Sequence, residues 1–128
     1  MENYKLAQAE KKFAEMIWER EPVPSSELVR LCGEEMNWKK STTYTVLKKL
    51  CQKGIFRNEN AVVSAVIGRE EFYSLQSRKY VEETFGGSLP RFLTAFCGGR
   101  KLTAGEVEEM KRFIEENTRE DERGKRDD

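Results

Sequence analysis

Apolar residues near the start of the chain recur at the three- and four-residue spacing of an amphipathic α-helix. This spacing predicts a helix over residues 5–20, whose apolar face consists of Leu6, Ala9, Phe13, Met16 and Ile17. Pro22 and Pro24 end the helix, and Ser25 and Ser26 are expected to cap a second one. The apolar positions of this second predicted helix are Leu28, Val29, Leu31 and Cys32.

A third helix is predicted over residues 41–52. Its apolar stripe, at helical spacing, is Thr43, Val46, Leu47 and Leu50. Gly54 fits the position just past a helix end, where a positive φ is required. Two β-like runs follow over residues 55–57 and 62–67, joined by a turn over residues 58–60. A hairpin after a third helix is typical of the wing of a winged helix-turn-helix.

The second half of the chain predicts three more helices, separated by pairs of glycines. The first covers residues 69–85, and the second is short, very apolar and opened by Ser88. A capping box, in which Thr103 is followed three residues later by a glutamate, opens the last helix. Residues 118–128 contain no apolar side chain, and we predict that they form a charged, flexible tail.

Charge is unevenly distributed along the chain, although 23 basic and 23 acidic residues give a net charge of zero. Residues 36–58 contain six lysines and arginines and no aspartate or glutamate, so this segment carries +6 and the remainder −6. A basic segment on an otherwise acidic molecule is an electrostatic footprint typical of nucleic-acid binding.

The third predicted helix combines this charge with short polar side chains. A helix that enters the DNA major groove needs one apolar side to seat it on its own domain, and hydroxyl and cationic groups on the other. We therefore predict DNA contacts by Lys39, Lys40, Ser41, Thr42, Tyr44, Thr45, Lys48, Lys49 and Lys53. The absence of acidic residues favours this interpretation over an ordinary solvated helix face. In the wing, Arg57, Asn58 and Asn60 either reach the DNA or are ordinary turn residues.

Large apolar residues are abundant in the three C-terminal helices, which are too short to hide them all within one chain. Burial of each against a partner would contribute roughly 1.5–3 kcal/mol. The predicted dimer contacts are Phe72, Tyr80, Phe85, Leu89, Phe92, Leu93, Phe96, Val107, Met110 and Ile114. The alternative is that they pack back onto the N-terminal domain. A two-fold dimer would place two recognition helices about 34 Å apart, as a palindromic site requires.

Residue types that several other functions need are missing. The chain has no histidine, which excludes Ser–His and Cys–His nucleophiles and histidine metal clusters. Cys32, Cys51 and Cys97 are widely spaced, so we interpret them as small hydrophobic residues in a reducing compartment. We expect no enzyme activity, no cofactor and no metal site. The amphipathic N-terminus and the lack of a long apolar run predict a cytoplasmic protein that does not insert into membranes.

Several stretches of the sequence carry a resemblance to a known family. They are AEKKFAEMIWER, TTYTVLKKLCQKGIF, SAVIGREEF, and VEETFGGSLPRFLTAF followed by KLTAGEVEEMKRFIEE. Over residues 5–117 the chain resembles the penicillinase repressor family of winged-helix transcriptional regulators (BlaI/MecI/CopY type). The resemblance implies a homodimeric repressor that binds an operator dyad. Thr42 and Thr45 match recognition-helix threonines that contact the operator, and Lys49 matches a position that is usually arginine.

The resemblance also implies a route of regulation. In antibiotic-responsive members, a signal from a membrane sensor-protease leads to cleavage within the short dimerisation helix. The matching bond here is Ala95–Phe96, and this chain has Ala95 where those members carry asparagine. Copper-responsive members carry a C-terminal cysteine cluster, and this chain has no cysteine after Cys97, so we do not expect copper sensing.

We therefore predict a mainly α protein with a small β wing, in which residues 1–68 bind DNA and residues 69–117 dimerise. The predicted function is repression of transcription by a homodimer that occupies a palindromic operator and excludes polymerase, with relief by proteolysis in the dimerisation segment. An alternative from another class is a winged-helix adaptor that binds proteins, which predicts an exposed apolar patch near the third helix. No residue supports a third class, the regulatory subunit of an enzyme.

Overall fold

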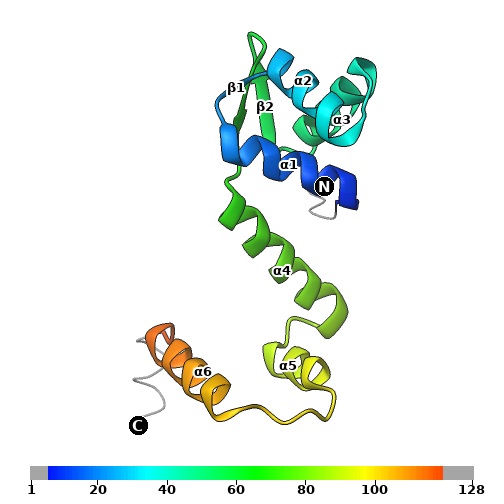
Figure 1. Cartoon of the computed structure of the whole chain (residues 1–128). Coiled ribbons are helices and arrows are strands. Elements are labelled where there is room, and N and C mark those ends of the chain that lie inside the picture. Colours follow the sequence, from blue (N-terminus) through cyan, green and yellow to red (C-terminus); the bar gives the residue numbers. More distant parts are fainter. Residues whose placement is uncertain (1–5, 120–128) are drawn as a thin grey trace. The chain divides into compact units, whose positions relative to one another are not determined.

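The computed structural model describes residues 6–119, and Figure 1 shows the helices and short strands of this part of the chain. The helices are α1 (Gln8–Arg20), α2 (Ser25–Met36), α3 (Lys40–Gln52), α4 (Arg69–Phe85), α5 (Leu89–Cys97) and α6 (Ala104–Glu116). The strands are β1 (Val23–Pro24), β2 (Phe56–Glu59) and β3 (Val62–Ala65). The predicted mainly α fold with a small β wing is confirmed. The tail predicted over residues 118–128 lies, beyond Arg119, outside the described residues.

The chain forms two compact units, which divide between Gly87 and Ser88. The N-terminal unit contains the sheet and helices α1 to α4, and the C-terminal unit contains α5 and α6. The division falls after α4 because the first turns of this helix pack onto the N-terminal core. The predicted functional division at residue 68, with DNA binding before it and dimerisation after it, stays a prediction.

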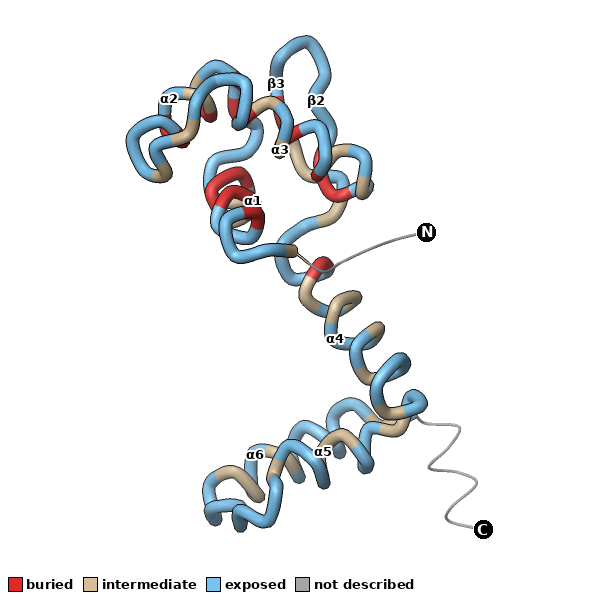
Figure 2. Tube along the Cα trace, turned by 90° about the vertical axis from the view of Figure 1, so that its right-hand side faces the viewer, coloured by how far each residue is buried: buried red, intermediate tan, exposed pale blue. Residues whose placement is uncertain are grey.

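One hydrophobic core holds the N-terminal unit together. Its fully buried side chains come from α1, α2, α3 and the hairpin, and include Phe13, Ile17, Leu28, Leu50, Ile55 and Val63. Figure 2 shows the buried residues gathered in these elements, with one more at the start of α4. The apolar face predicted for the first helix is confirmed at Phe13, Met16 and Ile17, which are at most 3% exposed.

The wing is part of a three-stranded antiparallel sheet with the order β1-β3-β2. The turn predicted over residues 58–60 is wrong, because Asn58 lies in β2 opposite Val63. The chain reverses instead at Asn60 and Ala61, whose φ angles are +54° and +61°. Two-residue turns of this kind match the natural twist of a hairpin, and asparagine tolerates the left-handed conformation better than most residues.

Ser25 does not cap α2 as predicted. Pro24 occupies the cap position, no side chain caps the helix, and Ser25 is its first residue, only 4% exposed. Its backbone N–H donates to the carbonyl oxygen of Ala61 at 2.9 Å, and its hydroxyl lies 3.2 Å from the hydroxyl of Tyr44. Ser25 therefore joins the start of α2 to the wing turn and to α3.

Phe72 was predicted as a dimer contact, and the structure corrects this. The side chain is 1% exposed and belongs to the N-terminal core. Its ring centroid lies 5.4 Å from that of Trp18 on α1 and 5.4 Å from that of Tyr73. Because its own chain already covers it, Phe72 has no surface left for a partner to contact.

The C-terminal unit has well-formed helix starts but no buried side chain in either helix. The Ser88 hydroxyl oxygen accepts from the backbone N–H of Arg91 at 3.2 Å, as the predicted cap requires. The predicted capping box is also confirmed: the Thr103 hydroxyl accepts from the N–H of Glu106 at 3.1 Å, and the Glu106 carboxylate accepts from the N–H of Thr103 at 2.9 Å. Local sequence thus determines where α5 and α6 begin, but neither helix has a buried face.

None of the three cysteines, all of them in the described residues, forms a disulfide: Cys32 is buried, and Cys51 and Cys97 are half-buried. Burial raises the pKa of the Cys32 and Cys51 thiols above the ordinary value, so these two stay protonated at neutral pH. Across residues 6–119, none of the helices combines the length and the apolar character that crossing a bilayer demands.

Replacing Phe72 with alanine is expected to lower the free energy of unfolding of the N-terminal unit by about 3–5 kcal/mol, because a fully buried ring is deleted. Urea unfolding followed by tryptophan fluorescence measures this, since Trp18 and Trp38 both lie in the N-terminal unit. The matched control is Val66→Ala in the same unit, just after β3, whose side chain is 49% exposed. Equal, small effects of the two substitutions would contradict the core position of Phe72.

Candidate nucleic-acid interface

One face of α3 holds this helix against the N-terminal core. Thr43, Leu47 and Leu50 are at most 2% exposed, and Val46 is half-buried. Because these residues recur at helical spacing, the opposite face of α3 is turned to solvent. The predicted apolar stripe of this helix is confirmed.

The solvent-facing side of α3 carries short hydroxyl side chains near its N-terminal end. Ser41, Thr42 and Thr45 are all exposed. The Thr45 hydroxyl donates to the carbonyl oxygen of Ser41 at 2.9 Å, so its own oxygen still has lone pairs that accept. Hydroxyl groups that donate and accept suit both phosphate oxygens and base edges.

The N-terminal end of α3 is electropositive for a second reason. Lys39 is the cap residue, no side chain caps the helix, and its first turn contains no acidic residue. The first backbone N–H groups of a helix lack partners within the helix, and its dipole places partial positive charge there. This end of α3 therefore favours the binding of an anion such as a phosphate.

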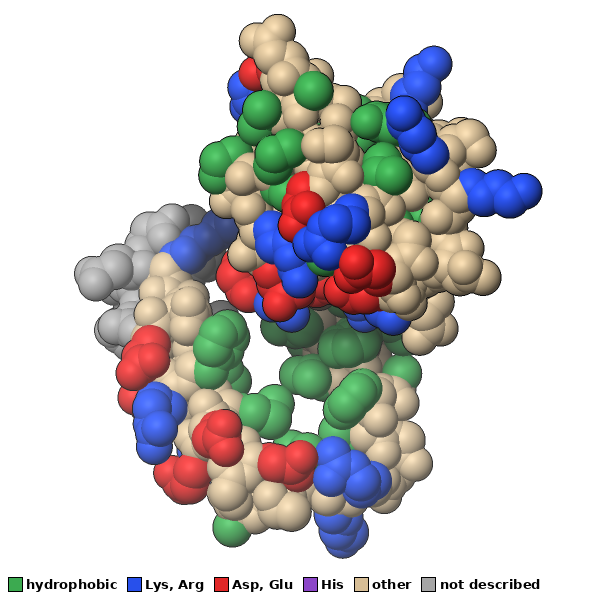
Figure 3. Space-filling view, turned by 45° about the horizontal axis from the view of Figure 1, so that its top comes forward, with side chains coloured by type: hydrophobic (Ala, Val, Ile, Leu, Met, Phe, Trp, Pro, Cys, Tyr) green, Lys and Arg blue, Asp and Glu red, His purple; other side chains and the backbone are tan. Residues whose placement is uncertain are grey.

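Three lysines lie at this end of α3 and along its solvent-facing side. Lys39, Lys40 and Lys48 are exposed, and within residues 6–119 none of them forms an ion pair with a carboxylate. Figure 3 shows basic side chains projecting from the part of the N-terminal unit where α3 lies. Cations without a neutralising carboxylate are available to phosphate groups of a nucleic acid. We call Lys39, Lys40, Ser41, Thr42, Thr45 and Lys48 the outer face of α3.

Lys49 lies outside this outer face and binds α1. Its Nζ is 2.6 Å from Oε2 of Glu10, a residue only 8% exposed. The other carboxylate oxygen of Glu10 accepts from the backbone N–H of Ala7 at 3.0 Å. The hydrogen bond from Lys49 outweighs the effect of burial and lowers the pKa of Glu10. Lys49, predicted as a DNA contact, is thus already engaged in tying α3 to α1.

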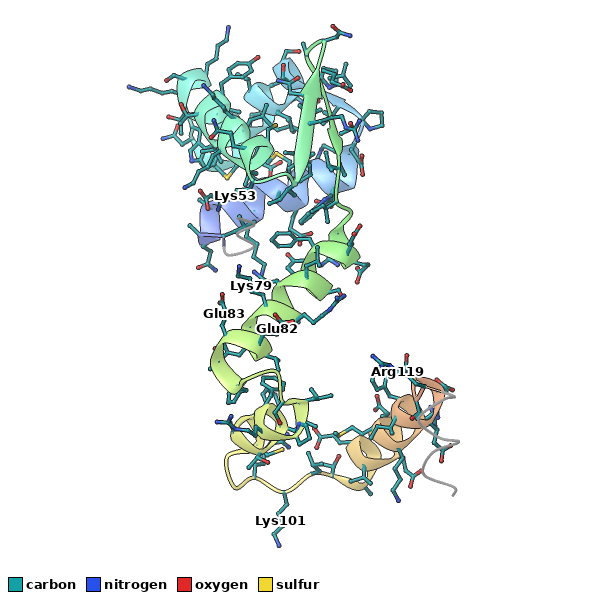
Figure 4. The ribbon with its side chains drawn as sticks, turned by 180° about the vertical axis from the view of Figure 1, so that it is seen from behind. Lys53, Lys79, Glu82, Glu83, Lys101 and Arg119 are labelled. Carbon is teal, nitrogen blue, oxygen red and sulfur yellow. The ribbon has the colours of Figure 1, made fainter. Side chains whose placement is uncertain are left out.

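Two more predicted contacts lie away from the N-terminal outer end of α3. Tyr44 is half-buried against the core, with its hydroxyl 3.2 Å from that of Ser25. Lys53 is the C-cap residue of α3 (Figure 4), and its positive charge helps to lower the pKa of Glu10. Both residues therefore lie away from the outer face, and their contact with DNA stays a prediction.

The wing residues are exposed but nearly neutral as a group. Arg57 and Asn58 lie on β2, and Asn60 occupies the turn. The Arg57 guanidinium is 4.0 Å from the carboxylate of Glu59, which weakens its attraction for phosphate. Whether these side chains reach DNA stays a prediction.

The residues predicted to dimerise, apart from Phe72, lie on the surface or half-buried in α4, α5 and α6. Hydrophobic side chains of these helices are open to solvent in Figure 3. The exposed ones among the predicted contacts are Tyr80, Leu89, Phe96 and Ile114, at 53%, 55%, 69% and 57% exposure. The predicted cleavage residues, Ala95 and Phe96, are both exposed on α5. The structure also exposes Phe113, at 61%, beside the predicted set on α6.

Sequence reasoning missed Glu10, although a signal for it is present. Leu6, Glu10, Phe13 and Ile17 follow one another at helical spacing, so this glutamate interrupts the apolar stripe of α1. A carboxylate inside an apolar stripe is expected to bind a cation from a neighbouring element. That expectation would have predicted a basic partner, which the structure identifies as Lys49.

Comparison with known proteins identifies similar sequences. The sequence model of a family described as penicillinase repressor matches residues 6–116. The methicillin resistance regulatory protein MecI of Staphylococcus aureus is 17% identical over 115 residues, which cover 87% of this chain and 94% of that protein. The matched region thus includes the outer face of α3 and all six helices.

Replacing Lys49 with glutamate is expected to lower the free energy of unfolding by about 1–2 kcal/mol, because a second carboxylate would lie beside the largely buried Glu10. Lys48→Glu is the matched control on the adjacent exposed position and is expected to change stability by less than about 0.5 kcal/mol. Thermal or urea unfolding measures both variants. A destabilisation of Lys48→Glu as large as that of Lys49→Glu would contradict the assigned role of Lys49.

Proposed function

This chain belongs to the penicillinase repressor family, and on that basis we propose that it represses transcription by binding operator DNA as a homodimer. The observation that carries the proposal is the outer face of α3. This face joins an uncapped helix N-terminus, three hydroxyl side chains and three lysines, without an acidic residue among them.

The two kinds of side chain on this face have different roles in the proposal. Lys39, Lys40 and Lys48 neutralise phosphates, which supplies affinity and positions the helix on the duplex. Thr42 and Thr45 enter the major groove, where hydroxyl groups contact base edges and the threonine methyl groups contact thymine. Neutralisation releases condensed counterions, so binding weakens steeply as the salt concentration rises.

The C-terminal unit supports the homodimer in this proposal. A segment of this size, with no buried side chain in α5 or α6, has too little core to be stable alone. Leu93, Phe96, Leu102 and Met110 line an open groove of about 430 Å³ within it. A second copy that covers these side chains gives both chains a shared core and supplies the two-fold symmetry that an operator palindrome needs.

The adaptor hypothesis expects an exposed apolar patch near α3. Within residues 6–119, the large hydrophobic residues that are exposed all lie outside α3. Val62 and Val66, on the hairpin, are the exposed ones nearest to it in sequence, at 41% and 49% exposure. The polar outer face of α3 therefore favours a nucleic-acid partner over a protein partner.

Lys48→Glu is expected to weaken binding to duplex DNA about tenfold or more and to reduce the slope of log K against log salt by about 1, because one phosphate contact is lost. The probe is a duplex selected from a random pool by the wild-type protein, titrated by fluorescence anisotropy at several salt concentrations. Lys101→Glu is the matched control, since Lys101 lies in the other unit, between α5 and α6 (Figure 4).

Two results of the duplex titration would overturn the proposal. If Lys48→Glu and Lys101→Glu bind the selected duplex with the wild-type affinity and salt slope, the outer face of α3 does not contact DNA. If the wild-type protein selects no duplex at all, the protein is not a sequence-specific DNA-binding protein.

Phe96→Asp is expected to produce monomers at protein concentrations where the wild-type protein is a dimer, because a charge would be buried at the interface. Sedimentation equilibrium measures the mass, and Phe96→Leu serves as the control that keeps an apolar side chain. Dimers of Phe96→Asp as stable as those of the wild-type protein would place the interface elsewhere.

A further inference from the structure

Glu15 on α1 holds the first turns of α4 with both of its carboxylate oxygens. Oε1 accepts from Nε of Arg69 at 2.8 Å, and Oε2 accepts from the hydroxyl of Tyr73 at 2.5 Å. The two donors lie one helical turn apart on α4 and more than 50 residues from Glu15 in the sequence. Hydrogen bonds to an ionised carboxylate are shorter and stronger than those between neutral groups.

Neighbouring groups also hold the junction between α1 and the start of α4. The indole N–H of Trp18 donates to the carbonyl oxygen of Ile67, just before α4, at 3.0 Å. The Tyr73 ring lies 6.0 Å from the Trp18 ring, 5.2 Å from the Arg69 guanidinium and 5.6 Å from Nζ of Lys11. A cation over an aromatic ring is a favourable arrangement, and two cations lie over this ring. Hydrogen bonds, ring packing and charge thus act on α4 together.

The protonation states suit this arrangement. Desolvation and the hydrogen bond to Glu15 raise the pKa of Tyr73 to about 12, so the phenol is a donor at neutral pH. Desolvation opposes ionisation of Glu15, but the hydrogen bonds from Tyr73 and Arg69 outweigh it and lower the pKa of this carboxyl. Glu15 is therefore an ionised acceptor under ordinary conditions.

These contacts lie at the start of α4. Phe72 is the one residue of this helix that is buried, and Leu75 is the last one that packs against the N-terminal core. From there to Phe85, α4 extends beyond the core, as Figure 1 shows. The contacts of α4 with Glu15 and Trp18 of α1 therefore all come from its first two turns.

We propose that Glu15, Arg69 and Tyr73 are positioning residues that lock the direction in which α4 leaves the winged helix, and thereby set the half-site spacing that the dimer accepts. The proposal rests on the proposed function, because spacing has a meaning only for a dimer that binds two half-sites. None of the three residues lies on the outer face of α3, so they would act on specificity without contacting DNA.

The lever that α4 provides is long enough for this role. Its 17 residues span about 25 Å at the helical rise. A rotation of about 10° at its first turn would move its far end by about 4 Å over that length. That displacement is comparable with the rise of one base pair, about 3.4 Å. A small loosening at the start of α4 therefore displaces its far end by about the rise of one base pair.

The first test measures the direction of α4 in the full chain without DNA. Spin labels are attached at Lys12→Cys on α1 and Glu82→Cys on α4 (Figure 4) in a cysteine-free background, diluted with unlabelled protein so that distances within one chain are recorded. Tyr73→Phe and Arg69→Gln are each expected to widen the distance distribution about twofold. Arg78→Gln is the matched control, because Arg78 hydrogen-bonds only Ser74 of its own helix in the described part of the chain. Wild-type widths in both junction variants would overturn the proposal.

The second test measures spacing. The selected operator is compared with versions whose half-sites are moved apart or together by one base pair. The ratio of the affinity for the selected operator to the affinity for each shifted operator is expected to fall about fivefold in Tyr73→Phe and Arg69→Gln. The affinity of both variants for a single half-site is expected to equal that of the wild-type protein. An unchanged ratio alongside a wider distance distribution would overturn the role in spacing. Absence of any DNA binding by the wild-type protein would instead reject the proposed function, while the distance measurement still decides the role of the junction.

Discussion

The burial of one side of α3 is the constraint on which the rest of the structure depends. Thr43, Leu47 and Leu50 are almost completely buried, and each leucine contributes roughly 1.5–3 kcal/mol by leaving water. Turning the helix would lose this energy and bury lysines without partners, which is far more costly. The hydroxyl and lysine side chains of the outer face are therefore exposed as a direct consequence of core packing. The surface proposed to bind DNA is exposed because the opposite side of α3 is apolar.

Carboxylates of α1 attach the two helices that matter for the proposed function. Glu10 binds Lys49 of α3, and Glu15 binds Arg69 and Tyr73 of α4. Both carboxylates lie largely covered by the protein, where ion pairs and hydrogen bonds are screened less than at the surface. In the proposed function α1 does not contact DNA. It holds α3, which carries the outer face, and α4, which leaves the winged helix.

Local pattern was sufficient for the helices and insufficient for contacts between distant segments. The residues of α4, the Thr103 capping box and the stripe of α3 were predicted because periodicity and caps are encoded within a few residues. The pairing of β1 with β3 was missed because a two-residue strand exists only through a partner 40 residues away. The basic segment was recognised from composition. The ion pair of Lys49 with Glu10 and the packing of Phe72 on Trp18 were not predicted, because these partners come from another helix.

The central claim is that DNA meets the side of α3 opposite its buried stripe. The most direct measurement is a titration of the ¹⁵N-labelled protein with a short duplex at low ionic strength, followed residue by residue through the backbone amide resonances. The account predicts the largest shifts at Lys40, Thr42, Thr45 and Lys48, at the start and along the outer face of α3. Shifts confined to the wing, α1 or the C-terminal helices, with these resonances unchanged, would contradict it.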